Sequence, residues 1–230
     1  MIGIAFVFVG WLIGRVIYGY VHSFSFRLSQ EIHAAYIEIY PENPPHFAPE
    51  KSILTPMKTK ISQPYYCLFF ALLFALCYWL NENILTAICW ACFCSLLFAI
   101  SVVDGYYRLI SPALCQNLFA LGLGAAYWQI TPLTLKQSLQ SAVIFFAVFS
   151  LIYYGAKWYY KQEAFGRGDC WLALGLGAFF SYEQLPAFLL LACLSGLVYA
   201  LYGKLNKRYL TTIPFGPFLS LSGVLCRLLN

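Results

Sequence analysis

Long runs of apolar residues, separated by short polar stretches, dominate the chain from its first residues to its last. A helix needs about 20 mainly apolar residues to cross the hydrocarbon core of a membrane, and fewer where protein surrounds its end. By this criterion eight segments are expected to span a membrane: 2–21, 65–80, 84–103, 112–130, 138–156, 170–183, 185–202 and 213–229. Pro112, Pro132 and Pro186 stand near segment ends, where proline is best tolerated. The pattern therefore predicts an all-α, polytopic transmembrane helix bundle.

The composition agrees with a membrane protein and excludes several other classes. Of the 230 residues, 61% are hydrophobic and 10% are charged, whereas about a quarter of the residues in soluble domains are charged. The mean hydropathy is +0.71. An aromatic content of 19% excludes a disordered chain, which has few aromatic residues. The net charge of +5 is spread over short segments, so no basic face for nucleic acid is expected.

The Lys and Arg residues indicate how the chain is oriented. With the N-terminus outside, eleven of the 14 basic residues fall in the inner segments 22–64, 104–111, 157–169 and 203–212. Because Lys and Arg concentrate in cytoplasmic loops, this orientation is the expected one. The segment 22–64 is then a cytosolic loop, in which Leu28 to Ile39 could form a short interfacial helix. No repeat or second domain is evident, so residues 1–230 are expected to form one membrane-embedded domain.

Only two of the nine carboxylates are aspartates, and both stand at the inner ends of expected spans. Asp104 follows the third span and Asp169 precedes the sixth, which puts both at the cytosolic face at a similar depth. Carboxylates at this depth are costly to desolvate and usually functional. Two that meet resist double ionisation, and a pair that shares one proton can activate a water molecule, as in aspartic proteases. The alternative, that each caps a helix or faces headgroups, suits Asp169 better than Asp104, which ends a helix.

Gly166 and Gly168 stand directly before Asp169 in a G-x-G-D pattern. Glycine at these positions would let the backbone approach a substrate closely and adopt φ > 0, or would turn the chain back into the membrane. The pattern is not a dinucleotide-binding fingerprint, because no strand precedes it and the third glycine is absent. It favours an active-site loop only in combination with Asp104 in the matching topology.

Four stretches give the sequence a resemblance to the type IV prepilin peptidases, the bacterial branch of the membrane-embedded GxGD aspartyl proteases. They follow one another in the family's order: Gly10 to Gly14, Asp104 to Pro112, Gly166 to Ala178, and Ile213 to Gly223. The last three are similar to D-x-x-x-x-x-I-P-D, G-x-G-D-x-K-L-x-A-x-x-G-A and I-P-F-G-P-x-L-A-x-G. The chain departs from these patterns at Ser111, Pro112 and Trp171, and no departure removes an aspartate.

The resemblance implies an endopeptidase of the bacterial inner membrane, with its active site facing the cytosol, that cuts the basic leader from prepilins or pseudopilins. Asp104 and Asp169 would be the catalytic pair, and Gly166 and Gly168 would shape the active-site loop. A broken helix start at the border of the substrate groove would comprise Pro214, Phe215, Gly216 and Pro217. The expected partners are substrate helices and membrane lipid, and nucleic acid is not expected.

Many members of this family also methylate the new N-terminus with S-adenosylmethionine, and many bind zinc through two C-x-x-C pairs in the first cytosolic loop. Here no cysteine stands between His22 and Gln63, and three irregularly spaced histidines are too few for a structural zinc site. The nine cysteines lie almost entirely in apolar runs and are expected to be buried thiols. Zinc is therefore not expected, proteolysis needs no cofactor, and methylation stays open.

A non-enzymatic transporter or a secretion-assembly subunit is the main alternative. It predicts charges along a pathway or an inverted repeat, and neither is evident. Another branch of GxGD protease and an inactive homologue are further alternatives. Glu163 is expected to be solvated surface or to attract the basic leader of the substrate. Three tyrosine pairs, at 106–107, 153–154 and 159–160, are expected in the aromatic belts at the membrane interfaces.

Overall fold

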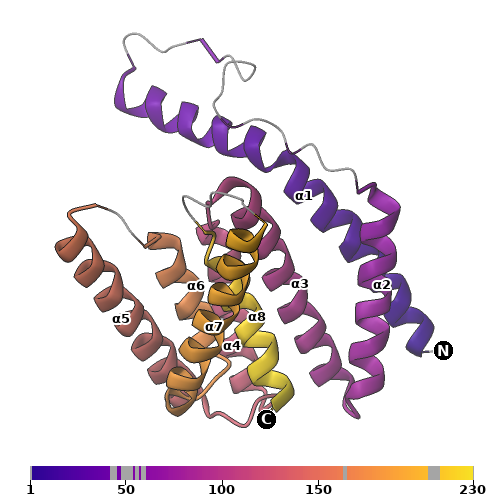
Figure 1. Cartoon of the computed structure of the whole chain (residues 1–230). Coiled ribbons are helices and arrows are strands. Elements are labelled where there is room, and N and C mark those ends of the chain that lie inside the picture. Colours follow the sequence, from indigo (N-terminus) through magenta and orange to yellow (C-terminus); the bar gives the residue numbers. More distant parts are fainter. Residues whose placement is uncertain are drawn as a thin grey trace. The chain divides into compact units, whose positions relative to one another are not determined.

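The computed structural model describes residues 2–41, 46–47, 54, 57, 61–162, 165–206 and 213–229. Within these ranges every regular element is a helix (Figure 1). The helices are α1 (Ile2–Ile39), α2 (Gln63–Leu80), α3 (Ile84–Tyr107), α4 (Pro112–Tyr127), α5 (Leu135–Tyr160), α6 (Arg167–Gly177), the single 3-10 turn η2 (Tyr182–Gln184), α7 (Leu185–Leu205) and α8 (Gly216–Leu229). The expected all-α fold and its eight helices are confirmed.

The chain divides into two compact units, Met1–Leu80 and Asn81–Asn230. In the first unit α1 packs against α2, and two glycines of α1 bring the backbones together. A Cβ placed on Gly14 would lie 2.7 Å from Cα of Cys67, and one on Gly10 would collide with the carbonyl oxygen of Phe70. Small residues one turn apart permit this close approach between membrane helices.

The first helix is longer than the sequence pattern predicts. That pattern predicts a span that ends at residue 21 and a loop that begins at residue 22, in which Leu28 to Ile39 could form a separate short helix. Instead α1 continues without a break to Ile39. Residues 22–39 contain neither glycine nor proline, so nothing interrupts the helix until Pro41. Proline disfavours the helical conformation in the residue before it, which accounts for the end of α1.

The second unit is built around the short helix α6. This helix contacts α4, α5 and α8, while α8 also contacts α3 and α7. Leu172, Ala173 and Leu176 of α6 have no exposed surface. Glycines again set the packing distance, since a Cβ on Gly177 would lie 2.8 Å from the Phe145 side chain of α5. The result is a rigid, close-packed support beneath the N-terminal turn of α6.

Five of the helical stretches are long and apolar enough to cross a membrane: Ile2–Ile39, Gln63–Leu80, Ile84–Tyr107, Leu135–Tyr160 and Tyr182–Leu205. The chain is therefore a multi-pass membrane protein. Helices α4, α6 and α8 have 16, 11 and 14 residues, or lengths of about 24, 16 and 21 Å, against a hydrocarbon core of about 30 Å. The count of eight full crossings stays a prediction for these three.

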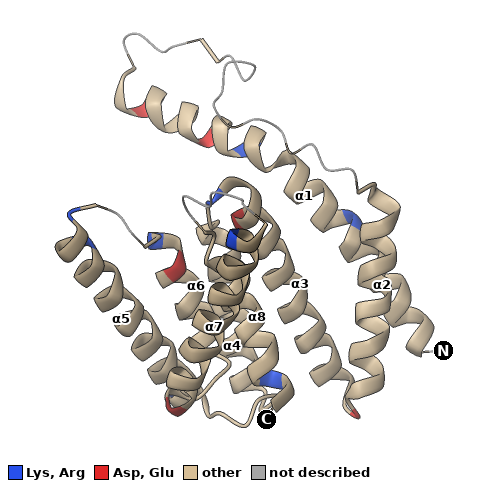
Figure 2. Ribbon diagram, in the orientation of Figure 1, with Lys and Arg blue, Asp and Glu red and all other residues tan. Residues whose placement is uncertain are grey.

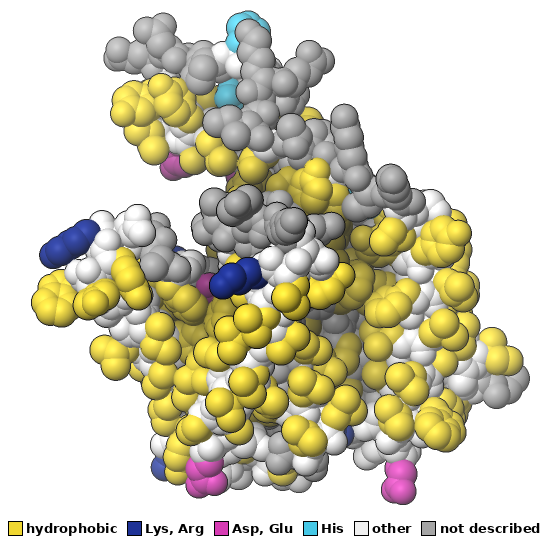
Figure 3. Space-filling view, viewed as in Figure 1, with side chains coloured by type: hydrophobic (Ala, Val, Ile, Leu, Met, Phe, Trp, Pro, Cys, Tyr) yellow, Lys and Arg dark blue, Asp and Glu magenta, His cyan; other side chains and the backbone are white. Residues whose placement is uncertain are grey.

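Charge and apolar surface are distributed as a membrane requires. In the second unit the charged segments lie at the ends of the helices, and the central stretches carry none (Figure 2). Hydrophobic side chains cover most of the described part of the face in Figure 3. Leu151 and Val198, for example, are 74% and 65% exposed. Such large apolar residues are stable at the surface when lipid surrounds them.

Candidate active site

Asp104 lies in the last turn of α3, where its carboxylate is buried and hydrogen bonded. Only 5% of the residue is exposed, and its Oδ2 accepts a hydrogen bond of 2.8 Å from the backbone N–H of Gly216. Gly216 is the first residue of α8, and the N-terminus of a helix favours a negative charge. Asp104 lies at the C-terminus of α3, where the helix dipole disfavours a negative charge. The N-terminus of α8 stabilises that charge.

Asp169 lies in the first turn of α6, and one of its oxygens has no partner. The residue is 5% exposed, and its Oδ1 is buried without a hydrogen bond from any described residue. The carboxyl group accepts a backbone hydrogen bond from Gly166, which is the N-cap residue of α6. A buried carboxyl oxygen without a partner is costly and uncommon in folded proteins, and catalytic groups are among the exceptions.

The packing of three helices brings the two aspartates to one level. A Cβ on Gly223 would lie 2.8 Å from Cδ2 of Leu176 and 3.6 Å from Cδ1 of Leu97, so α8, α6 and α3 meet there. Seven positions, or about two helical turns, separate Gly223 from Gly216, Leu176 from Asp169, and Leu97 from Asp104. Gly216, Asp169 and Asp104 therefore also lie at a common level. The hydrogen bond from Gly216 to Asp104 confirms this register for α8 and α3.

The electrostatics of Asp169 show that the two carboxyl groups interact. Asp169 precedes the apolar stretch of α6, and its pKa is raised to about 7. Burial is the largest cause, because desolvation disfavours the charged form, and the nearby charge of Asp104 acts in the same direction. The hydrogen bond from Gly166 opposes both. The structure thus brings together the two residues that the sequence analysis singled out.

The two glycines before Asp169 are needed for close approach. A Cβ on Gly168 would lie 2.7 Å from Cβ of Ile110, and one on Gly166 would lie 3.0 Å from Oδ2 of Asp169. No described glycine has a positive φ, and Gly166 has φ −78° and ψ 135°. These close contacts are with Ile110 and Asp169, so the expected close approach to a substrate stays a prediction, whereas the expectation of φ > 0 is wrong.

Of the segment from Pro214 to Pro217, one residue contacts Asp104 and a second contacts the residue before the glycine loop. Gly216 holds Asp104, and the ring of Phe215 lies 5.5 Å from that of Phe165. Phe165 directly precedes the glycine loop and also lies 6.1 Å from Phe149 of α5. This aromatic contact joins the loop of Asp169 to the start of α8. Whether the segment borders a substrate groove stays a prediction.

Tyr153 and Arg167 form a contact that the sequence analysis missed. The Nε of Arg167 donates a hydrogen bond of 2.8 Å to the hydroxyl of Tyr153, and the guanidinium lies 5.6 Å from the tyrosine ring centroid. Tyr153 is 3% exposed, so its assignment to an aromatic belt is wrong, whereas Tyr154, which is 65% exposed, points outward. Tyr153 follows Phe149 at helical spacing, and both residues lie on the buried face of α5. This spacing was the feature of the sequence that could have indicated burial of Tyr153.

Metal-binding residues do not cluster in the part of the chain that the structure describes, where no three His, Cys, Asp or Glu side chains come together. The same part contains nine free cysteines, six of them buried. Glu163, expected either as surface or as a docking group for the leader, lies outside the described residues.

Sequence comparisons place the chain among known proteins. The model of the type IV leader peptidase family matches residues 91–201, a range that includes both aspartates. A prepilin leader peptidase/N-methyltransferase of Haemophilus influenzae is 38% identical over 227 residues, which cover 98% of this chain and 96% of that protein. The chain belongs to the type IV leader peptidase family.

Other members of this leader peptidase family align over shorter ranges. A prepilin leader peptidase/N-methyltransferase of Escherichia coli K12 is 35% identical over 136 residues, or 58% of this chain and 59% of that protein. A leader peptidase of Salmonella typhimurium is 34% identical over 104 residues, or 44% of this chain and 67% of that protein. No solved structure matches the chain.

Proposed function

We propose that this protein is a membrane-embedded aspartic endopeptidase that removes the basic leader from type IV prepilins or pseudopilins. Membership of the type IV leader peptidase family supports peptidase activity, and the relatives' names support prepilins as the substrate. The observation that carries the proposal is the placement of Asp104 and Asp169. Both are buried at one level of the bundle, interact electrostatically, and leave one carboxyl oxygen unpaired. The relatives do not favour a transporter or an assembly subunit.

The surroundings of the two carboxyl groups suggest different roles for them. Asp104 accepts the N–H of Gly216 at the start of a helix, an arrangement that favours its ionised form. Asp169, with its pKa raised to about 7, would hold the proton that the pair shares. Asp104 would then take a proton from the attacking water, while Asp169 donates its proton to the carbonyl oxygen of the scissile peptide bond. When the C–N bond then breaks, Asp104 would give its proton to the leaving amine, and Asp169 would take a proton back from a hydroxyl of the tetrahedral intermediate. This step forms the new carboxyl group and restores the starting protonation of the pair.

The expected topology places this chemistry at the cytosolic face of the bacterial inner membrane, with the N-terminus outside. A prepilin helix would lie in the membrane with its basic leader in the cytosol, so that its scissile bond arrives at the depth of the carboxyl groups. The segment Pro214–Pro217 would border the groove that receives it, because Gly216 already touches Asp104.

Methyl transfer would be a second activity, and it would need S-adenosylmethionine, which supplies an electrophilic methyl group. The names of the Haemophilus and Escherichia relatives include this activity. A cavity lined by Trp90 and Arg227 does not fit this cofactor, since the cofactor is a cation and no acidic residue lines the cavity.

The proposal is tested with the full chain in proteoliposomes and a leader-bearing prepilin. Mass spectrometry should find a product that has lost the leader, and the product should be absent when empty liposomes replace the protein. Labelled S-adenosylmethionine added to the same reaction reports methylation separately. An intact prepilin after prolonged incubation with correctly inserted protein would contradict the proposed peptidase activity.

A further inference from the structure

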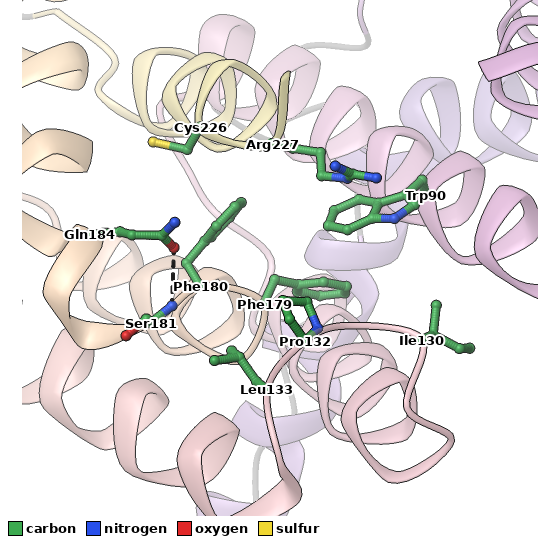
Figure 4. Close-up of a pocket in the computed structure, with 10 residues that line it drawn as sticks. All are labelled: Trp90, Ile130, Pro132, Leu133, Phe179, Phe180, Ser181, Gln184, Cys226 and Arg227. Atoms are coloured by element: carbon green, nitrogen blue, oxygen red, sulfur yellow. Dashed lines mark hydrogen bonds between the residues drawn. The ribbon is translucent and has the colours of Figure 1, made fainter. Parts of the chain in front are cut away.

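A cavity of about 190 Å³ lies at the end of the second unit that is remote from the aspartates (Figure 4). It is bordered by Trp90, in the second turn of α3, and by Arg227, in the last turn of α8. Trp90 precedes Asp104 by 14 residues of one helix, a rise of about 21 Å. The cavity is therefore separate from the candidate active site.

Arg227 brings a positive charge into this cavity, and no carboxylate of the described residues neutralises it. The guanidinium lies 4.4 Å from the ring centroid of Trp90, and the side chain is half-buried. No Asp or Glu among the described residues pairs with it. Stacking on an aromatic face uses the face of the guanidinium and leaves its N–H groups in the ring plane free to donate. Its position at the C-terminus of α8 favours the charge but supplies no further partner for these donors.

Two other side chains of the lining, Trp90 and Gln184, carry N–H donors. The indole Nε1 of Trp90 has no hydrogen-bond partner among the described residues, although Trp90 is only 7% exposed. The amide oxygen of Gln184 is already used, because it accepts the backbone N–H of Ser181 at 3.1 Å, and this leaves the Gln184 NH₂ group (Figure 4). None of the lining residues is acidic. A site that offers a cation and N–H donors suits an anion.

The rest of the lining is apolar and indicates what kind of anion fits. Pro132, Leu133 and Phe180 form part of the wall (Figure 4), and a free phosphate ion would gain nothing from them. The cavity lies at a helix end, where the expected topology places the boundary of the bilayer. We propose that it binds an anionic phospholipid such as phosphatidylglycerol, with the phosphate at Arg227 and the glycerol and upper acyl chains against the apolar wall. A headgroup ammonium would find no carboxylate here.

Lipid titration of the detergent-solubilised full chain, followed by native mass spectrometry, tests the proposal independently of peptidase activity. The wild-type protein should retain phosphatidylglycerol more tightly than phosphatidylcholine. Arg227→Gln should weaken phosphatidylglycerol retention about tenfold or more, since hydrogen bonds to charged groups are among the stronger ones. Lys136→Gln removes a positive charge that is exposed and outside the cavity, and it should leave retention unchanged.

Two further variants and a competing anion separate the contributions of Trp90, the Arg227 guanidinium and the lipid phosphate. Trp90→Phe keeps an aromatic face and removes the N–H, and it should weaken retention by a smaller factor than Arg227→Gln. If Arg227→Gln does not fold, Trp90→Phe and Arg227→Lys still test the site, because lysine keeps the charge and loses the guanidinium fork. Equal retention of phosphatidylglycerol and phosphatidylcholine, or no effect of the Arg227 and Trp90 changes, would overturn the proposal. Displacement of the lipid by millimolar inorganic phosphate would assign the site to a free anion instead.

Discussion

Replacing Gly216 with alanine is the sharpest way to disturb one carboxyl group without removing it. A methyl group at this position would lie 2.7 Å from Oδ2 and 3.1 Å from Cγ of Asp104. Nonbonded atoms do not approach so closely, so the carboxyl group must move away. The hydrogen bond of 2.8 Å from the Gly216 N–H would then be lengthened or lost, although the N–H itself remains.

The size of the effect follows from that hydrogen bond. Hydrogen bonds to charged groups contribute about 1.5–3 kcal/mol, and about 1.36 kcal/mol corresponds to a tenfold change in rate. We therefore expect Gly216→Ala to lower kcat for prepilin cleavage by about 10- to 100-fold. KM should change little if the carboxyl group acts on the reacting atoms. The assay is steady-state cleavage of a leader-bearing prepilin by the full chain in proteoliposomes.

Gly155 of α5 provides the matched control. A Cβ at Gly155 would have no atom within 4 Å, so Gly155→Ala makes the same chemical change in a helix without a collision and should leave kcat at the wild-type value. If Gly216→Ala were correctly inserted and cleaved within twofold of the wild-type rate, the contact between α8 and Asp104 would have no part in catalysis.

Three further predictions follow from other contacts. Because Asp169 has a pKa raised to about 7, it keeps its proton below that pH and loses it above. The kcat for prepilin cleavage should therefore fall above about pH 7. A kcat that stays constant up to pH 9 would contradict a shared proton. Tyr153→Phe removes the hydroxyl that accepts from the charged guanidinium of Arg167 and should lower kcat by about tenfold, near the lower end of what a hydrogen bond to a charged group contributes. A change confined to thermal stability would show that the contact only supports the fold. Gly10→Ala places a methyl group against the backbone of α2 and should destabilise the detergent-solubilised protein by about 1–3 kcal/mol in thermal unfolding, whereas Gly19→Ala, with open space around it, should not.

The positions of the helices could be predicted from the sequence because apolar runs and charged ends mark them directly. The hydropathy pattern predicts too early an end for α1, because the residues become polar after Val21 although no helix breaker occurs before Pro41. The short length of α6 was also hidden, because its last residue, Gly177, is followed by further apolar residues. Hydropathy shows where residues can be buried, and backbone geometry decides where a helix stops.

The sequence was sufficient to predict which residues form the candidate site, but it did not predict the contacts between them. Asp104 and Asp169 could be paired because the distribution of Lys and Arg predicts which end of each span faces the cytosol. The hydrogen bond from Gly216 to Asp104 joins residues 112 positions apart and depends on the register between α3 and α8, which no local pattern encodes. Tyr153 was misassigned because a tyrosine near a helix end can face either lipid or the core. Only the packing of α5 against α6 decides between the two.

The pairing of Asp104 with Asp169 is tested most directly by comparing single and double asparagine variants in the prepilin cleavage assay. Asparagine keeps the size of the side chain and removes its proton chemistry, and correct membrane insertion is checked for each variant. If both carboxyl groups act on one water molecule, each single change should reduce cleavage to a similar low residual rate, and the double change should reduce it no further. Cleavage at the wild-type rate by Asp169→Asn, or losses that multiply in the double variant, would contradict a catalytic pair.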